Sequence, residues 1–195
     1  LPLFVGSFIL GGNFSARLAP DCIAITVSGR HKGQLTVADI MQIDAAGKSL
    51  DGRRPSAETG LHTQLYRRFP DIHVVLHHHS LYATLISQFI PDRIVFENYE
   101  LLKAFPGITT HATRMEVPVF ANDQDIPRLA ENVGKYMDKH PPIHGYLISG
   151  HGLYTWGNSV ETALKEVETF EFLCKSELIK RGVRTLAWVR LDVIL

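Results

Sequence analysis

Apolar runs of strand length alternate with segments of helical periodicity along the chain, which predicts a mixed α/β fold. The β-branched run at residues 22–27 stops at Ser28-Gly29, as a strand that ends in a turn would. Pro118 cannot donate to a β-ladder, so the strand that contains it is predicted to lie at the edge of its sheet. The further apolar runs that predict strands are residues 74–76, 93–96, 117–120 and 143–148.

Three helices are predicted in the first half of the chain, from residues that start and stop helices. Ser56 is the expected N-cap of a helix that Pro70 ends. Ser80 is the expected N-cap of the next helix, at residues 81–89. A third, short helix is expected at about residues 99–105.

Two longer helices are predicted in the second half. Pro127 suits the first turn of a helix whose apolar face includes Leu129 and Val133. Asn158, followed three residues later by Glu161, resembles a capping box, and apolar residues with helical spacing follow it. Several histidines are therefore expected at strand ends and in loops, where functional sites tend to lie on a rigid scaffold.

Composition narrows the class of protein. A chain of 195 residues that is 45% hydrophobic can bury one sizeable core, so we expect a single domain over residues 1–195. Lys+Arg and Asp+Glu both number 20, so the chain has no net charge that would attract nucleic acid or a membrane surface. Cys22 and Cys174 form neither a disulfide framework nor a thiolate zinc site, which fits a cytoplasmic protein.

The first ten residues are mostly apolar but too few to span a bilayer, and they lack the basic start of a signal peptide. We expect them to be the remnant of an entry strand or helix. The chain does not begin with methionine, so the natural N-terminus could be missing.

The run His77-His78-His79 closes the apolar strand at 74–76. Successive side chains of a strand alternate between faces, so His77 and His79 point one way and His78 the other. Two imidazoles side by side at a strand end can chelate one cation, and His151 is well placed to be a third ligand. The strand alone equally allows a polar end whose histidines meet solvent.

Short loops of glycine and small polar residues lie at residues 11–15 and 28–29. Their N–H groups and hydroxyls could cradle a phosphate, and the helix N-terminus at Ser56 is also an anion site. Plain turns are the commoner explanation for each piece, so together they favour a phosphorylated substrate only modestly. Glu58 and His62, four residues apart, could be a metal or acid–base pair or a surface hydrogen-bonded pair.

An ordered set of motifs carries a family resemblance that no single piece supplies. The set is similar to the class II aldolase/adducin-head family, from about residue 11 to about residue 180. Two longer strings, YELLKAF at 99–105 and HGLYTWG at 151–157, resemble members that dehydrate 5-methylthioribulose 1-phosphate in methionine salvage. The ordered motifs are GGNFS at 11–15, SG at 28–29, PSAET-x-LH at 55–62, H-x-HS at 77–80 and HG at 151–152.

The resemblance implies a central, mainly antiparallel sheet flanked by helices, assembled as a homotetramer with sites near subunit interfaces. It implies one zinc ion per subunit on His77, His79 and His151, and Glu100 as the general acid/base. Glu58 stands where the family's aldolases keep a glutamate beside the metal, and here we expect it to bind substrate or water. The residues that the resemblance assigns to the substrate and its phosphate are Gly12, Asn13, Ser28, Gly29, Ser56 and Glu58.

The implied reaction removes water from 5-methylthioribulose 1-phosphate to give 2,3-diketo-5-methylthiopentyl 1-phosphate. A metal-polarised ketone acidifies the neighbouring C–H, a carboxylate takes that proton, and the next hydroxyl leaves as water. A sugar-phosphate aldolase or epimerase would use the same zinc on a different bond, but Glu100 with Lys103 and the string YTWG favour the dehydratase. A non-catalytic adducin-head-like interaction module is the alternative of another class, and it has no use for three aligned imidazoles.

Overall fold

The computed structural model describes residues 11–192. The entry strand or helix expected at residues 1–10 lies outside this range. None of the helices in the described range is both long enough and apolar enough to cross a membrane.

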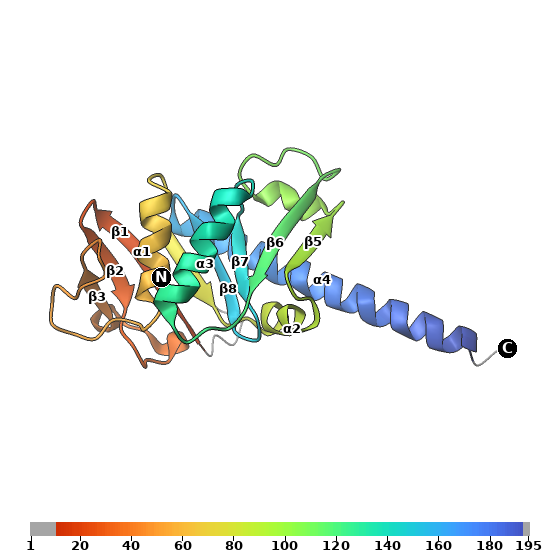
Figure 1. Cartoon of the computed structure of the whole chain (residues 1–195), viewed down its shortest axis with the longest axis horizontal. Coiled ribbons are helices and arrows are strands. Elements are labelled where there is room, and N and C mark those ends of the chain that lie inside the picture. Colours follow the sequence, from red (N-terminus) through yellow and green to blue (C-terminus); the bar gives the residue numbers. More distant parts are fainter. Residues whose placement is uncertain (1–10, 193–195) are drawn as a thin grey trace.

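One eight-stranded sheet in the order β3-β2-β1-β4-β8-β7-β6-β5 forms the centre of the molecule (Figure 1). Every pair of neighbouring strands is antiparallel except β6 and β7, which are parallel. The expected mixed α/β fold with a mainly antiparallel sheet is therefore confirmed. The strands are β1 (Gly12–Ala19), β2 (Cys22–Thr26), β3 (Ile40–Ile43), β4 (Val74–His78), β5 (Arg93–Glu97), β6 (Arg114–Phe120), β7 (Gly145–Ile148) and β8 (Gly152–Gly157).

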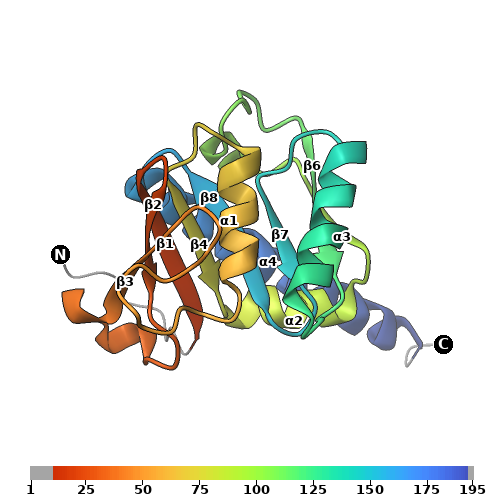
Figure 2. The same ribbon diagram turned by 60° about the vertical axis from the view of Figure 1, so that its left-hand side comes forward.

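Helices cover both faces of this sheet (Figure 2). On one face, α1 and α3 bury leucines such as Leu61 and Leu129 against Val75 and Tyr154. On the other face, α2 and α4 pack around Ile86 and Phe170, and α4 continues well beyond the sheet (Figure 1). The helices are α1 (Thr59–Arg68), α2 (Leu81–Phe89), α3 (Ile126–Lys139) and α4 (Val160–Asp192), with 3-10 segments η1 (Lys32–Gln34), η2 (Val37–Asp39) and η3 (Glu100–Ala104).

Two of the predicted helix starts shift by one or a few residues. Ser80 caps α2 as predicted, accepting the N–H of Ala83 at 3.0 Å. Ser56 is not the cap of α1: the helix begins at Thr59 with Glu58 at its N-cap. At α4 the hydroxyl of Ser159, rather than Asn158, accepts a backbone N–H, because its oxygen reaches the amide three residues later.

The prediction that residues 117–120 form an edge strand is wrong. Strand β6 lies between β5 and β7, and β5 is the edge. Pro118 is tolerated because pairing with β7 begins at Val119, the residue after it, so its missing N–H removes no bond of that ladder.

Strands β1, β3 and β8 were not among the predicted elements. The expected loop at residues 11–15 is the start of β1, which pairs with β4 so that Gly12 lies opposite His78. Gly12 has a φ of 121°, and a Cβ there would lie 2.2 Å from the carbonyl oxygen of His77. This glycine is therefore needed for a close approach of β1 to β4 and not for a turn.

Candidate metal centre and active site

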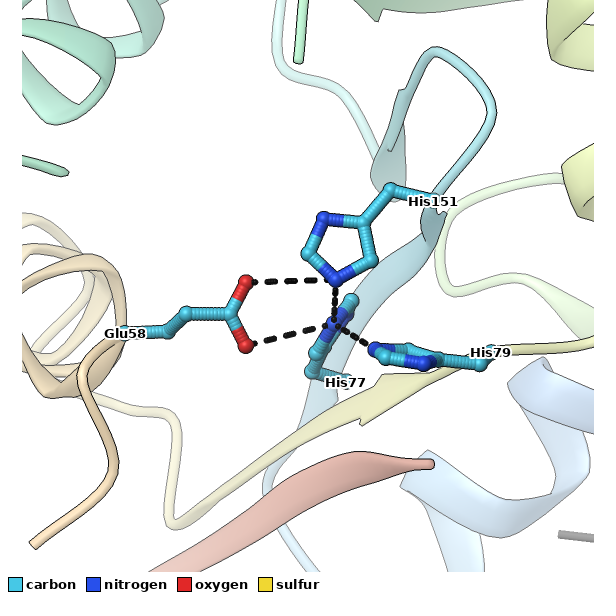
Figure 3. Close-up of side chains that lie close together, drawn as sticks. All are labelled: Glu58, His77, His79 and His151. Carbon is cyan, nitrogen blue, oxygen red and sulfur yellow. Dashed lines mark hydrogen bonds and ion pairs between the residues drawn. The ribbon is translucent and has the colours of Figure 1, made fainter. Parts of the chain in front are cut away.

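Three histidines and one carboxylate converge at the end of β4 (Figure 3). His77 and His79 come from β4 and the residue after it, and His151 from the turn between β7 and β8. The Nε2 atom of His77 lies 2.9 Å from Nε2 of His79 and 3.4 Å from Nε2 of His151. One ligand atom from each of these residues and from Glu58 lies within 4.8 Å of all the others.

The alternation of side chains along β4 brings two of these imidazoles together. His77 and His79 share a face, as predicted, and His78 points to the opposite face, where it is buried and its pKa is lowered by burial. Strand β8 comes so close to β4 here that position 152 has no room for a side chain: a Cβ on Gly152 would lie 2.5 Å from the carbonyl oxygen of His78. The Ser-Gly-His-Gly sequence thus lets the β7–β8 turn present His151 beside the end of β4.

The donor set fits a divalent cation. Zinc–nitrogen bonds of about 2.0–2.1 Å in tetrahedral geometry place ligand atoms about 3.3 Å apart, close to the separations of these Nε2 atoms. The Nδ1–H of His77 donates to the carbonyl oxygen of Leu153 at 3.0 Å, which leaves Nε2 with its lone pair facing the site. Burial, and then the neighbouring imidazoles, lower the pKa of His77, and the same causes lower that of His79 to about 4. Both rings are therefore neutral, the form that binds a metal.

Aromatic packing fixes the ring of His77 from behind. Tyr154 is fully buried on β8 and stacks on His77, with ring centroids 4.1 Å apart and an angle of 14° between the planes. Tyr146 on β7 stacks in turn on Tyr154 at 4.9 Å. The apolar contacts of these rings restrict rotation of the imidazole and so pre-organise one ligand of the site.

Glu58 is the carboxylate that the chain places beside the histidines. Its Oε2 lies 3.4 Å from Nε2 of His77, and its Oε1 lies 3.6 Å from Nε2 of His151 (Figure 3). Position 58 is the N-cap of α1, so the start of that helix delivers the side chain. The amide of Asn13 donates to Oε2 at 2.6 Å. Sequence reasoning singled out both residues but did not foresee their contact.

The centre opens into a cavity of about 260 Å³. Ser28 and Ser56 line it together with Glu58 and His151, because a β-bridge between Val27 and Pro55 holds their two loops side by side. Residues that the sequence analysis did not assign to the site line other parts of the cavity: Asn122, Asp123, Gln124, Ile126 and Leu129.

A basic residue that sequence reasoning missed, Lys32, lies beside the loop at residues 28–29. Lys32 donates to the carbonyl oxygen of Val27 at 3.4 Å, next to the Ser28-Gly29 turn, where Gly29 has a φ of 76°. Its positive charge is also one cause of the lowered pKa of His79. The metal centre therefore has a cation and two hydroxyl-bearing loops in its neighbourhood, a combination suited to a phosphorylated ligand.

Within one chain, Glu100 lies away from the three histidines. It lies in η3, just after the Glu97 end of β5, which pairs with Arg114 at the start of β6. The opposite end of β6, at Phe120, is the one bonded to Ser149 in the turn that carries His151. The Glu100 side chain is 68% exposed and contacts Lys103 and His111, and the Lys103 ammonium lowers its pKa.

Comparison with known proteins identifies a family model and close relatives. The model described as Class II Aldolase and Adducin N-terminal domain matches residues 8–178. The chain is 59% identical over 173 residues to a methylthioribulose-1-phosphate dehydratase of Methylococcus capsulatus, covering 89% of this chain and 85% of that protein. A dehydratase of the same name from Pseudomonas fluorescens is 54% identical over 173 residues, covering 88% and 83%.

Solved structures share the fold at much lower identity. An L-fuculose-1-phosphate aldolase from Thermus thermophilus superposes with a TM-score of 0.72 at 25% identity, covering 92% of this chain and 89% of that one. A sugar-phosphate aldolase from Thermotoga maritima gives a TM-score of 0.63 at 15% identity, covering 91% and 88%. The class II aldolase-like fold expected from the sequence is thereby confirmed.

Proposed function

The chain belongs to the class II aldolase and adducin N-terminal domain family, and from that membership we propose that it is a metal-dependent hydro-lyase acting on 5-methylthioribulose 1-phosphate. The product is 2,3-diketo-5-methylthiopentyl 1-phosphate, and the reaction belongs to methionine salvage. The observation that carries the proposal is the cluster of three imidazoles opening into a cavity lined by hydroxyl-bearing loops. The relatives that are 53–59% identical supply the choice of reaction.

We propose zinc as the metal, one ion per chain, held by His77, His79 and His151. Nitrogen donors in this number suit zinc and leave a position open for substrate. A zinc ion bound there would polarise the substrate ketone and so acidify the neighbouring C–H bond. Tyr154 and the Leu153 carbonyl keep the imidazole of His77 aimed at the centre while substrate binds.

The phosphate end of the substrate is assigned to Ser28, Gly29 and Ser56, with Lys32 as its counter-charge. Hydroxyl and backbone N–H donors at two loops would fix the phosphate, and the ammonium group would favour its charge. Gly12 and Asn13, also assigned to the phosphate from the resemblance, lie on β1, and Asn13 donates a hydrogen bond to Glu58. Glu58 faces the metal position and is assigned to hold the substrate or water hydroxyl there.

For Glu100 we propose the role of general acid and base, supplied by a neighbouring copy of the chain. Within one chain it lies at the other end of the sheet from the histidines, and its side chain is exposed. A homotetramer with sites at its subunit interfaces would bring this carboxylate over the substrate of an adjacent subunit. There it would take the C–H proton and return a proton to the departing hydroxyl. We place this assembly in the cytoplasm, consistent with the free thiols of Cys22 and Cys174.

Removal and return of the metal tests the proposal. Dialysis against a chelator should abolish conversion of 5-methylthioribulose 1-phosphate, and one equivalent of zinc per chain should restore it. His79→Ala should bind no metal and show no turnover, while His140→Ala, at the exposed end of α3, should match the parent protein. Full conversion by metal-free protein would overturn the assignment, and cleavage of a carbon–carbon bond would favour an aldolase.

A further inference from the structure

A continuous line of buried polar side chains runs from the metal centre into the core between β1 and α1. Asn13, Ser15, His62 and Tyr66 are each at most 5% exposed. The amide of Asn13 donates to Glu58 and its oxygen contacts Nε2 of His62. The Oγ of Ser15 lies 2.7 Å from Nδ1 of His62 and 2.9 Å from the Tyr66 hydroxyl.

The periodicities of a strand and a helix build this line. Asn13 and Ser15 are two apart on β1, so their side chains share the face that α1 covers. Glu58, His62 and Tyr66 are four apart at the start of α1 and along it, so they follow one stripe of that helix. Packing of α1 on β1 therefore interleaves the two sets into a single chain of contacts.

The protons in this chain can be placed by starting from its Glu58 end. The NH₂ of Asn13 donates to Glu58, so the Asn13 carbonyl oxygen faces His62 and must accept from His62 Nε2–H. Nδ1 of His62 is then the bare nitrogen and accepts the Ser15 hydroxyl, which in turn accepts from Tyr66. Burial lowers the pKa of His62 to about 3 and raises that of Tyr66 to about 12, in keeping with a neutral ring and a protonated phenol.

We infer that the chain Tyr66–Ser15–His62–Asn13 acts as a one-directional hydrogen-bond relay that positions the Glu58 carboxylate at the metal centre. Asn13 holds Oε2, so Oε1 remains buried without a hydrogen-bond partner among the described residues, 3.6 Å from Nε2 of His151. If the Asn13 amide were free to flip, it would lose its hydrogen bond to Glu58, and the Glu58 carboxylate could turn away from the metal centre. The hydrogen bond from His62 prevents this flip. The four side chains are positioning residues, and their effect on turnover rests on the proposed function.

Kinetics of a graded variant series test the relay. Asn13→Asp, which replaces the donor with an acceptor facing Glu58, should lower kcat about 10–100-fold with zinc still bound and KM little changed. His62→Phe should lower kcat to a similar extent. His62→Gln, whose side-chain amide can still donate to Asn13, should recover much of the loss, and the kcat of Ser15→Ala should fall between those of His62→Gln and the parent protein.

A matched control separates positioning from stability. Thr63→Val alters a buried hydroxyl on the same helix whose one hydrogen bond within residues 11–192 is to the Gly60 carbonyl, so it should lower Tm without lowering kcat. If the kcat losses simply follow Tm across all variants, the relay has no role beyond packing. A change confined to KM in Asn13→Asp would instead assign Asn13 to the substrate and contradict the inference.

Two readouts do not depend on the proposed reaction. Nitrogen-15 NMR of labelled histidine should show His62 as the neutral Nε2–H tautomer at pH 5 to 8, and an Nδ1–H tautomer would overturn the relay. Zinc affinity, measured by competition with a chelator, should fall up to about 10–100-fold in Asn13→Asp and stay unchanged in Thr63→Val. If every variant lacks dehydratase activity but these two results hold, the proposed function fails and the relay stands.

Discussion

His77 shows how much of the site depends on the surroundings of one residue. Its Nδ1–H is bonded to the Leu153 carbonyl and its ring stacks on Tyr154, so both contacts come from β8. The sequence predicts which face of β4 the ring occupies, because alternation is a property of the strand alone. It does not predict the ring's tautomer, since that depends on a carbonyl 76 positions further along the chain.

In the proposed scheme Glu100 transfers the proton and Glu58 binds the substrate or water, and conservative substitutions distinguish the two roles. Glu100→Gln should keep its zinc and fold but lose turnover by at least about 100-fold, because an amide cannot carry the proton. Glu58→Gln should weaken zinc or substrate binding while retaining more of kcat. Metal analysis and steady-state kinetics check both, and full activity of Glu100→Gln would refute its role.

At the scale of elements, the strands with the clearest sequence signals are β2, β4 and β5, and those missed are β1, β3 and β8. Strand β1 opens with glycine and carries Asn13 and Ser15, residues typical of turns. It becomes a strand because it pairs with β2 and β4 on its two sides, which are contacts between distant parts of the chain. Helices α2 and α3 were predictable because their caps and apolar faces are local.

The junction of β1 and β4 should not tolerate a side chain at Gly12. Gly12→Ala would combine an unfavourable φ with a contact of 2.2 Å to the His77 carbonyl oxygen, so we expect a loss of more than about 2 kcal/mol in the free energy of unfolding. Gly29→Ala is the matched control: its φ is 76°, but nothing lies within 4 Å of the added Cβ. In urea denaturation, Gly29→Ala should lower the free energy of unfolding by about 1 kcal/mol. Equal losses for Gly12→Ala and Gly29→Ala would argue against the close approach of β1 to β4.

The contact of α4 with β8 should make stability depend on pH. Glu166 is buried beside Thr155, whose hydroxyl lies 2.7 Å from the carboxyl and 2.8 Å from the His144 carbonyl, and burial raises the pKa of Glu166 to about 7. The folded state therefore binds this proton more tightly than the unfolded state, so the stabilisation is present below about pH 4.5 and lost as pH rises through 7.

Glu166→Gln removes this titration while keeping a group of the same shape. Between pH 5 and 8 the parent protein should lose up to about 3 kcal/mol more of its free energy of unfolding than the variant does. Urea melts at the two pH values measure the difference. Parallel pH dependences of parent and variant would show that Glu166 is ionised in the folded protein.

At the scale of the whole molecule, one chain brings together most of the residues assigned to the site and leaves Glu100 apart from them. The histidines, Glu58, Ser28 and Ser56 meet within one chain, as the sequence motifs predict. Glu100 stays at the far end of the sheet. The sequence pattern of one chain does not predict which of its surfaces contacts another subunit. The role proposed for Glu100 could therefore come only from the family resemblance.

Mixed oligomers test whether a second copy supplies Glu100. Glu100→Gln and His79→Ala should each be inactive alone. When the two are refolded together as a tetramer, about a quarter of the sites would pair intact histidines with an intact Glu100 from another subunit, so activity should reappear. Mixed tetramers, verified by native mass spectrometry, that remain inactive would mean that no neighbouring subunit completes the site.

The central claim is that this family member removes water from its sugar phosphate. The most direct measurement is the mass of the product after the zinc-loaded protein is incubated with 5-methylthioribulose 1-phosphate, with His79→Ala as the blank. The account predicts a phosphorylated product lighter than the substrate by one water, formed only by the zinc-loaded parent protein. An unchanged mass, or two fragments from a broken carbon–carbon bond, would contradict it.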